Sequence, residues 1–455
     1  MIGDMARARL LALALCTALL GAAACSGGAD EGPPYRSSST LAAWPTYHHD
    51  AARSGHVATA PAGRLRHAWT RALSGDVYGE PLVVGSTLVV ATEHNRVYGL
   101  AARTGAVRWQ VRLGTPQPLA GLPCGNIDPL GITGTPAYDP ATRTVFVVAE
   151  TEGAHHTLWA LDPGSGTRRW HRDLDVLAER DRHAEQQRAA LLVAHGRVLT
   201  AFGGLAGDCG NYVGYVTSVP TTGRGPTYHF AVPTEREAGI WAPPGPVLGA
   251  NGHVYVATGN GASLSGRWDR SDSVTELGPV RLEPLSVFGP TSWREDNVAD
   301  LDLGSSSPAV VPLVGRIVIA GKRGEVYLLP PSLGGVGSAL ARLPGCTAFG
   351  GAAVAGSRVV MPCRGEDALR LLHVGASSLR WGWSAHGVYA SPVVAGDRVY
   401  AADEGSGDLV VLRLSDGSVV QRLHAGPMPH FPSEVVSGDW VFVPTPDGVA
   451  AFRGR

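Results

Sequence analysis

The chain has 455 residues, and its 38 Lys and Arg against 39 Asp and Glu give a formal net charge of −1. This composition excludes a basic nucleic-acid-binding stripe and a long acidic, disordered tail. With 60 Gly and 33 Pro, few helical patterns and frequent Val/Leu alternation, the chain favours an all-β repeat protein over an α/β enzyme.

Residues 1–24 predict a signal peptide. Arg7 and Arg9 precede the apolar run 10–20, which is too short to span a membrane and suits a secretory segment. The small residues at 21–24 before Cys25 resemble a bacterial lipoprotein cleavage box, although Ala22 stands where that box prefers Leu. The resemblance implies a lipidated Cys25 on a flexible tether, 25–43, and an extracytoplasmic membrane lipoprotein. Simple secretion is the alternative.

The remaining cysteines agree with export. Without Cys16, which lies in the signal peptide, and Cys25, four are left, and an even number outside the cytoplasm favours disulfides. Three pairings are open to four cysteines. Cys346 and Cys363 flank one predicted hairpin, so we pair them, which leaves Cys124 with Cys209.

A short unit recurs along the chain. Residues 96–109 are expected to form a strand, a Thr-Gly turn and a second strand that ends in Trp109. The unit returns at 158–170 and 409–419, with a weaker copy at 325–337. Eight copies of a preceding opening strand begin at residues 81, 136, 190, 246, 308, 352, 392 and 434. Four strands per repeat at this spacing predict an eight-bladed β-propeller of four-stranded antiparallel blades.

The two ends of the domain are expected to meet in one blade. The last repeat, which ends at 449–455, supplies only three strands, and a strand at 66–72 can complete it and remove the open edge. We therefore expect one propeller domain over 44–455. Segments 171–189 and 262–300 are expected to be insertions, the first with a short helix.

These units and the lead-in W-P-x-Y-x-x-D at 44–50 resemble the pyrroloquinoline quinone (PQQ) repeat β-propellers over about 44–455. The family has two functional classes. One contains the PQQ-dependent alcohol and sugar dehydrogenases, and the other contains lipoprotein scaffolds of the cell envelope without a cofactor. The resemblance implies the propeller fold but leaves both functions open.

Two stretches are similar to the segments that hold the quinone in the dehydrogenases. In 236–261 the resemblance makes Trp241 the floor under PQQ, and in 320–329 it makes Lys322 the basic contact to the quinone oxygens. Arg236, predicted at the same mouth of the central channel, is a third candidate for contact with the cofactor.

The resemblance also implies a calcium site and a catalytic base. Asp208, Asn260 and Asp302 match the positions of calcium ligands, and Asp302, or else Asp300, matches the base. Hard oxygen ligands of this kind are those that calcium prefers. Four departures stand against it: no adjacent Cys-Cys pair, Asp208 in place of the family's Glu, a chain shorter than those enzymes, and no haem-binding motif.

Each of these residues also has a purely structural interpretation. The sequence at 258–261 is typical of a hairpin turn without any catalytic or binding role. Asp302 would cap a turn, and Trp241 would be a packed loop residue. The departures favour a membrane-anchored scaffold that binds a small ligand or an envelope protein, and no nucleic acid. The alternative is a dehydrogenase of small alcohols, sugars or aldehydes that uses PQQ and calcium. Enzymatic activity is left open at this point.

Overall fold

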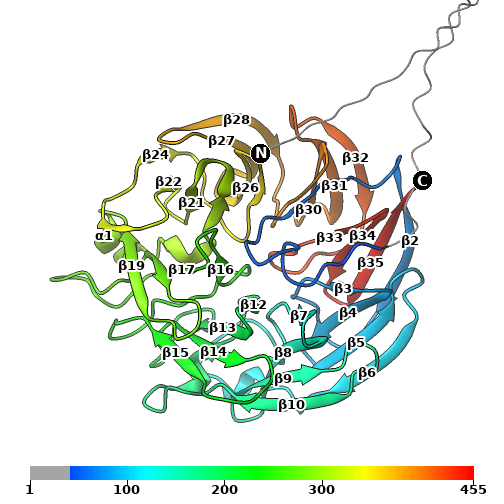
Figure 1. Ribbon diagram of the computed structural model, residues 1–455, viewed down its shortest axis with the longest axis horizontal. Coiled ribbons are helices and arrows are strands. Elements are labelled where there is room, and N and C mark those ends of the chain that lie inside the picture. Colours follow the sequence, from blue (N-terminus) through cyan, green and yellow to red (C-terminus); the bar gives the residue numbers. More distant parts are fainter. Residues whose placement is uncertain (1–40) are drawn as a thin grey trace, which may run out of the picture. The chain divides into compact units, whose positions relative to one another are not determined.

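The computed structural model describes residues 41–455, which form eight β-sheets around a central axis (Figure 1). The predicted signal peptide, Cys25 and nearly all of the predicted tether lie outside the described residues. The eight-bladed propeller predicted from the repeats is confirmed, and each blade contains four antiparallel strands.

The first four blades, numbered here in chain order, cover residues 82–289. Blade 1 contains β3 (Leu82–Val84), β4 (Thr87–Thr92), β5 (Arg96–Ala101) and β6 (Val107–Arg112). Blade 2 contains β7 (Ala137–Asp139), β8 (Thr144–Thr151), β9 (His155–Leu161) and β10 (Arg168–Asp173). Blade 3 contains β12 (Leu192–Ala194), β13 (Arg197–Gly204), β14 (Tyr215–Pro220) and β15 (Tyr228–Ala231), with β11 (Glu185–Gln186) added beside β13. Blade 4 contains β16 (Val247–Leu248), β17 (Val254–Thr258), β18 (Ser273–Leu277) and β19 (Pro284–Gly289).

The other four blades complete the ring. Blade 5 contains β20 (Ala309–Val311), β21 (Arg316–Ala320), β22 (Glu325–Leu329) and β24 (Ala341–Pro344). Blade 6 contains β25 (Ala353–Ala355), β26 (Arg358–Cys363), β27 (Ala368–Val374) and β28 (Leu379–His386). Blade 7 contains β29 (Val393–Ala395), β30 (Arg398–Asp403), β31 (Asp408–Arg413) and β32 (Val419–His424), and β1 (His56–Val57) pairs in parallel with β29. Blade 8 contains β33 (Val435–Ser437), β34 (Trp440–Thr445), β35 (Gly448–Gly454) and β2 (Leu65–Ala72).

Blade 8 closes the ring with strands from both ends of the domain. β2 pairs antiparallel with β35, from Leu65 opposite Gly454 to Ala72 opposite Gly448. In Figure 1 the blue β2 lies beside the red β35. The prediction for 66–72 is therefore confirmed, and the pairing leaves no open edge between the first and last blades.

Burial follows from the position of each strand in its blade. Every residue of β4 is buried, because the faces of this strand pack against neighbouring blades on both sides. The outer strand β28 alternates between half-buried and exposed residues over most of its length, since one of its faces meets water. Between blades 1 and 2, Val89 and Val97 pack with Val147 in one apolar cluster. The core is thus a ring of such layers.

Tryptophans of the outer strands join successive blades. The indole N–H of Trp109 donates to the Pro163 carbonyl, 3.1 Å away, in the turn between β9 and β10. Gly166 in that turn has φ +71°, and a Cβ there would lie 2.5 Å from the Trp109 ring, so the close contact requires glycine. Trp69 and Trp383 make the equivalent contacts with the following blades.

Two details differ from the sequence-based expectations. The weak repeat at 325–337 is not one hairpin: after β22, the segment β23 (Gly334–Val336) pairs in parallel with β19 of blade 4, and β24 completes blade 5. Pro330 and Pro331 lack the N–H groups that a hairpin ladder needs, so the chain leaves the sheet there. Segment 262–300 is not wholly an insertion, since it contains β18 and β19.

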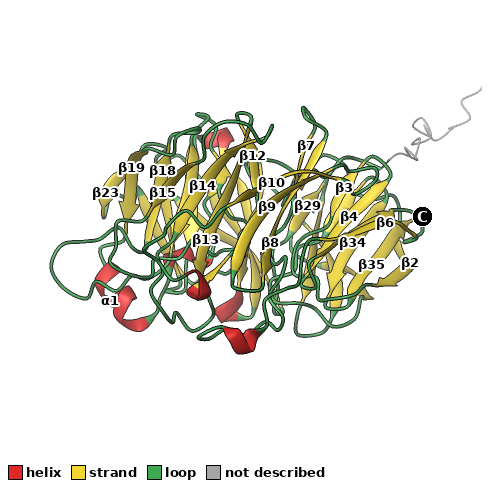
Figure 2. Cartoon of the chain, turned by 90° about the horizontal axis from the view of Figure 1, so that it is seen from below, coloured by secondary structure: helices red, strands yellow, loops and turns green. Residues whose placement is uncertain are grey.

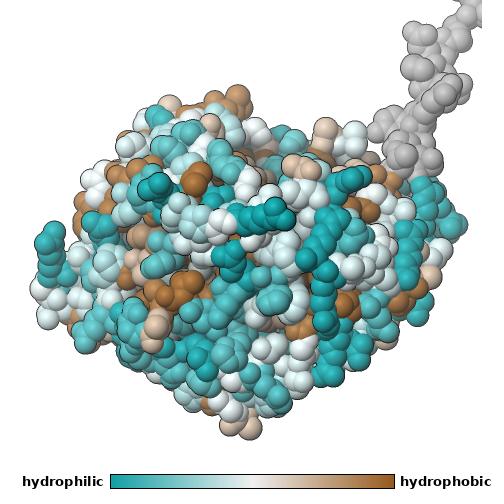
Figure 3. Space-filling view, turned by 60° about the horizontal axis from the view of Figure 1, so that its bottom comes forward, coloured by the Kyte–Doolittle hydropathy of each residue, from teal (hydrophilic) through white to brown (hydrophobic). Residues whose placement is uncertain are grey.

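Helical segments are short. They are α1 (Trp293–Ala299) and the 3₁₀ turns η1 (Leu119–Gly121), η2 (Arg182–Ala184), η3 (Leu303–Ser305), η4 (Pro312–Val314) and η5 (Arg364–Glu366). The short helix predicted within 171–189 is η2, and most helical segments lie towards one face of the propeller (Figure 2). Within 41–455, no helix is long and apolar enough to cross a membrane. The surface in Figure 3 is largely hydrophilic, with small scattered apolar patches.

Candidate functional site

Loops from most of the blades meet around a cavity of about 430 Å³, here called the mouth cavity. The chain segments before the opening strands of blades 1, 2, 3, 4, 5, 6 and 8 all contribute to it, as expected for the mouth of a propeller channel. Its lining residues are Tyr78, Asn126, Ile127, Gln186, Arg188, Gly204, Leu205, Ala206, Gly207, Asp208, Trp241, Asp300, Asp302, Lys322, Phe349, His430 and Phe431.

Three aromatic rings form one wall of the mouth cavity. The rings of Trp241 and Phe431 have centroids 6.4 Å apart and are tilted by 47°, and Phe349 stacks on Phe431 at 5.8 Å and 9°. The loop that carries Trp241 lies close to β13, where Gly203 and Gly239 let the two backbones approach. Trp241 is therefore placed at the cavity by backbone contacts between blades 3 and 4.

A lysine and two aspartates form the charged side of the mouth cavity. Lys322 Nζ lies 2.7 Å from Asp302 Oδ2 and 2.8 Å from Asp300 Oδ1. Burial alone would lower the pKa of Lys322, but the charges of Asp302 and Asp300 outweigh it and raise this pKa. Lys322 is thus a cation, and it lies 5.9 Å from the centroid of the Trp241 ring.

Asp208 and Arg236 hold the loop that borders the cavity. Asp208 lines the cavity and accepts a hydrogen bond from the Tyr212 hydroxyl, while burial, with a contribution from the charge of Asp302, raises its pKa. Arg236 pairs with Glu237 and donates to the backbone carbonyl of Asp208, 3.3 Å away. Arg236 does not line the mouth cavity, whereas Trp241, Lys322, Asp300, Asp302 and Asp208 do. Its contact with a cofactor stays a prediction.

The predicted calcium ligands do not form an open oxygen cage in this arrangement. Asp302 Oδ1 accepts the backbone N–H of Asn260 at 2.6 Å, and its other oxygen is bound by Lys322. The Asp208 carboxylate is already bound by Tyr212. A calcium ion at this place would therefore have to share the Asp302 carboxylate with the Lys322 ammonium. Calcium binding by Asp208, Asn260 and Asp302 stays a prediction.

Arg188 and Phe431 are cavity residues that the sequence analysis missed. The Arg188 guanidinium lies 5.0 Å from the Phe431 ring centroid and 5.8 Å from that of Tyr78. Arg364 lies 5.1 Å from the same Phe431 ring. The positions of Arg188 and Phe431 just before opening strands were the only sequence signal for them. The stack itself joins blades 3, 6 and 8, which no local pattern reveals.

Both predicted disulfides are present, Cys124–Cys209 and Cys346–Cys363. The first joins two loops that border the mouth cavity, since Asn126 and Ile127 follow Cys124 while Gly207 and Asp208 precede Cys209. Its cysteines are half-buried, whereas those of the second disulfide are fully buried.

Comparison with known proteins gives one family and several solved structures. The family model of outer membrane protein assembly factor BamB matches residues 29–203. A quinohemoprotein alcohol dehydrogenase from Pseudomonas putida HK5 superimposes with a TM-score of 0.72 at 15% identity, covering 90% of this chain and 80% of that one. A europium-containing methanol dehydrogenase gives 0.67 at 16% identity, with 90% of each chain covered.

BamB from Moraxella catarrhalis gives a TM-score of 0.59 at 14% identity, covering 86% of this chain and all of BamB. No curated protein matches the sequence. At these identities the structural likeness shows the fold alone, and it includes both an envelope protein and quinoprotein dehydrogenases. The resemblance of this chain to the PQQ repeat β-propellers is confirmed by the family model over 29–203 and by the fold that it shares with these proteins.

Proposed function

We propose that this protein is a ligand-binding propeller of the cell envelope whose mouth cavity takes a small, planar anion. The observation that carries the proposal is Arg188. Its Nε is buried without a hydrogen-bond partner at the cavity, and among the described residues its side chain forms no ion pair. A buried donor of this kind is costly to leave unpaired. A ligand carboxylate would satisfy it.

The rest of the cavity suits the same ligand. Trp241, Phe349 and Phe431 offer ring faces on which a planar molecule would stack. Lys322 lies beside Trp241, and its ammonium, which is paired with Asp300 and Asp302, would be a further hydrogen-bond donor to the ligand. PQQ, a planar tricarboxylic quinone, belongs to the proposed class, and the quinoprotein neighbours support its use as a probe.

The test is a titration of the full chain with PQQ, followed by tryptophan fluorescence, with and without calcium. We expect saturable binding without calcium, weakened about tenfold or more by Arg188→Gln, which is about 1.4 kcal/mol, and by Trp241→Ala. Arg168→Gln is the matched control, because Arg168 lies 5.3 Å from the Trp159 ring in a pair remote from the cavity. Absence of saturable binding, or equal losses in both arginine variants, would contradict the proposal.

A dehydrogenase is the second candidate, favoured by a carboxylate, Asp302, next to Lys322 and Trp241 in one cavity. PQQ, when bound, would accept the two electrons of an alcohol, sugar or aldehyde. The residues of this chain would stack the quinone on Trp241 and orient the substrate beside Asp302. Dye reduction with PQQ and a substrate panel tests this candidate. Turnover that Asp302→Asn abolishes supports it, and PQQ binding without turnover retires it.

We also propose that the chain is exported and anchored through a lipid on Cys25. The support is the sequence before Cys25 and the family model that matches an envelope protein. Export and the anchor are tested together by fractionating cells that express the full chain. We expect the protein in the membrane fraction, and Cys25→Ser in the soluble extracytoplasmic fraction. An unchanged distribution of this variant would contradict the anchor.

A further inference from the structure

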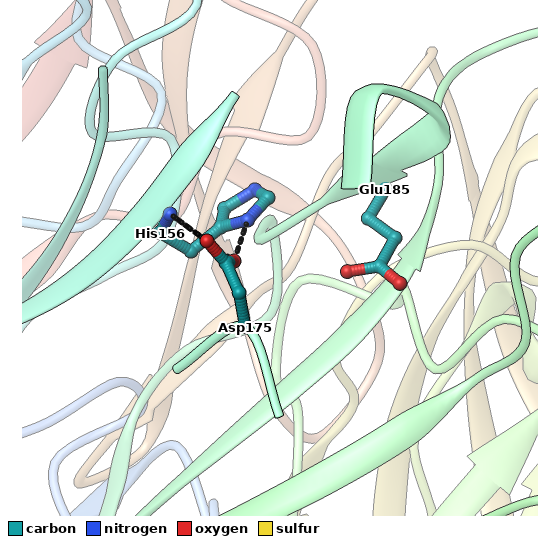
Figure 4. A group of neighbouring side chains, drawn as sticks. All are labelled: His156, Asp175 and Glu185. Atoms are coloured by element: carbon teal, nitrogen blue, oxygen red, sulfur yellow. Dashed lines mark hydrogen bonds and ion pairs between the residues drawn. The ribbon is translucent and has the colours of Figure 1, made fainter. Parts of the chain in front are cut away.

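A second group of charged side chains, none of which lines the mouth cavity, is buried between blades 2 and 3, and Figure 4 shows three of them. His156 lies on β9, Asp175 follows β10 and Glu185 lies on β11. Glu150, on β8, approaches the histidine from another side. We call these four residues the inter-blade cluster. His156 is 0% exposed, and Glu150 and Glu185 are each 2% exposed.

The histidine is at the centre of the inter-blade cluster. His156 Nδ1 lies 2.9 Å from Asp175 Oδ1, and Nε2 lies 3.3 Å from Glu150 Oε2. One ligand atom from each of His156, Asp175 and Glu185 lies within 4.8 Å of the other two. Tyr215 donates its hydroxyl to Glu185 Oε2 at 3.0 Å, which helps to hold that carboxylate in place. The atoms of three potential ligands thus converge on one buried point.

The buried carboxylates of the inter-blade cluster have too little positive charge around them to balance their negative charge. Three carboxylates surround one imidazole, and no Lys or Arg within 41–455 forms an ion pair with any of them. Among the described residues, the only other ion-pair partner is His155, whose Nδ1 lies 3.4 Å from Asp175 Oδ2 and whose side chain is half exposed. Buried carboxylates without an opposite charge are strongly unfavourable. A bound cation would correct this imbalance.

One unpartnered atom gives a further sign of a missing cation. Glu150 Oε1 is buried without a hydrogen-bond partner, while Glu150 Oε2 lies 3.3 Å from His156 Nε2. An imidazole that takes a metal ion on one nitrogen usually donates its other N–H to a carboxylate, which fixes the ring. Glu150 has the position of that carboxylate if the ion binds Nδ1, the nitrogen that faces Asp175.

We propose that the inter-blade cluster is a zinc site, with His156, Asp175 and Glu185 as ligands and Glu150 as the carboxylate that orients the imidazole. One nitrogen and two carboxylate oxygens suit a borderline ion such as Zn²⁺, which accepts His, Asp and Glu together. Water or the Leu174 carbonyl, which lies 3.5 Å from the Tyr215 hydroxyl, would complete four ligands. This site is independent of the function proposed for the mouth cavity.

The ion would connect two blades and support the cavity wall. His156 belongs to blade 2, whereas Glu185 begins the short β11 of blade 3, and the next residue, Gln186, lines the mouth cavity together with Arg188. Zinc would thus hold the segment 174–188, which otherwise has only a two-residue strand and one 3₁₀ turn. Its role would be structural, since the ligands are buried.

The test uses the full chain without a polyhistidine tag, stripped with EDTA and titrated with Zn²⁺ by calorimetry. We expect one Zn²⁺ per chain, a higher melting temperature with zinc, and an affinity at least about tenfold lower in Glu185→Gln, or about 1.4 kcal/mol. Glu276→Gln is the matched control, because Glu276 is 4% exposed and pairs with a single histidine, His253, at 2.7 Å. It should leave zinc binding unchanged.

A second variant keeps the test decisive if Glu185→Gln does not fold. Asp175→Asn should disturb packing less than Glu185→Gln does, because the Asp175 side chain is 13% exposed. It should weaken zinc binding in the same way. Co²⁺ in place of Zn²⁺ gives a visible spectrum that reports the ligands, and this spectrum should change in both variants. No zinc binding by the folded wild type, or equal binding in wild type, Glu185→Gln and Asp175→Asn, would overturn the proposal.

Discussion

In the mouth cavity Asp302 has a lysine ammonium 2.7 Å away, whereas in the inter-blade cluster three carboxylates share one imidazole. The first group opens to solvent, and its charges are met by Lys322 and by backbone and hydroxyl donors. The second is mostly buried, and Glu150 Oε1 has no hydrogen-bond partner there. The two groups differ in how their carboxylates are balanced. Those of the mouth cavity have a lysine ammonium beside them, whereas those of the inter-blade cluster have only imidazoles, and this is why we propose a metal ion in the cluster alone.

The disulfide at the mouth cavity offers the largest expected effect. In the chain-entropy description, closing the loop between Cys124 and Cys209, 85 residues apart, contributes about 4 to 5 kcal/mol, against about 3 kcal/mol for Cys346–Cys363, 17 residues apart. We expect the Cys124→Ser, Cys209→Ser double variant to lose that stability in denaturant unfolding and to bind PQQ more weakly, because its cavity loops are released.

Selective reduction can show which of the two disulfides supports the mouth cavity. Mild reductant should open Cys124–Cys209 first, since its cysteine residues are half-buried, while the fully buried Cys346–Cys363 persists. Alkylation followed by mass spectrometry identifies which pair has opened. Reduction of Cys346–Cys363 first, or full PQQ affinity after loss of Cys124–Cys209, would show that the disulfide does not support the cavity.

Lys322→Met tests whether the buried charge of Asp302 in the mouth cavity is stabilised by the Lys322 ammonium. The variant leaves Asp302, whose side chain is 5% exposed, without its opposite charge, and we expect a loss of about 3 kcal/mol in the free energy of unfolding. Asp300→Asn is the control: the Asp300 side chain is 62% exposed, so its pair with Lys322 should contribute less than about 1 kcal/mol. Similar losses in both variants would mean that Asp302 does not rely on Lys322.

Substitution of Glu93 is expected to have the smallest effect on the free energy of unfolding, and this effect should depend on pH. The Glu93 side chain is buried, and burial raises the pKa of its carboxyl from 4.5 to about 8. The folded chain therefore binds this proton more tightly than the unfolded chain, so its contribution to stability is present below pH 4.5 and is lost as the pH rises through 8.

We expect Glu93→Gln to remove this dependence and to be more stable than wild type at pH 8, by on the order of 2 kcal/mol. The backbone N–H of Gly131, which donates to Glu93 at 2.6 Å, would keep an acceptor in the glutamine oxygen. Urea unfolding of both proteins at pH 5 and pH 8 measures the difference. A variant that loses stability equally at both values would show that Glu93 is ionised throughout.

Much of the architecture was predictable because it repeats. Eight opening strands, turn glycines such as Gly166 beneath Trp109, and a last repeat one strand short each reflect local backbone requirements, and these predicted the blades and the closure by β2. The prediction failed at 325–337, where Pro330 and Pro331 end the ladder and the chain pairs with the preceding blade instead.

Residues of the candidate site could be predicted only where they lie in segments that resemble those of the PQQ-dependent dehydrogenases. Trp241, Lys322, Asp300, Asp302 and Asp208 were identified in this way, and all of them line one cavity. Arg188 and Phe431 were missed because their significance is a contact between side chains from different blades. Nothing in their local sequence marks such a contact.

The amino-acid sequence by itself determined the propeller and the strand that closes it, because turns, alternation and blade length are local properties repeated eight times. The tertiary structure alone decided that Lys322 neutralises Asp302 in the predicted calcium site, and that ligand atoms of His156, Asp175 and Glu185 lie within 4.8 Å of one another. Charge and burial depend on which blades become neighbours, and only the closed ring brings those side chains together.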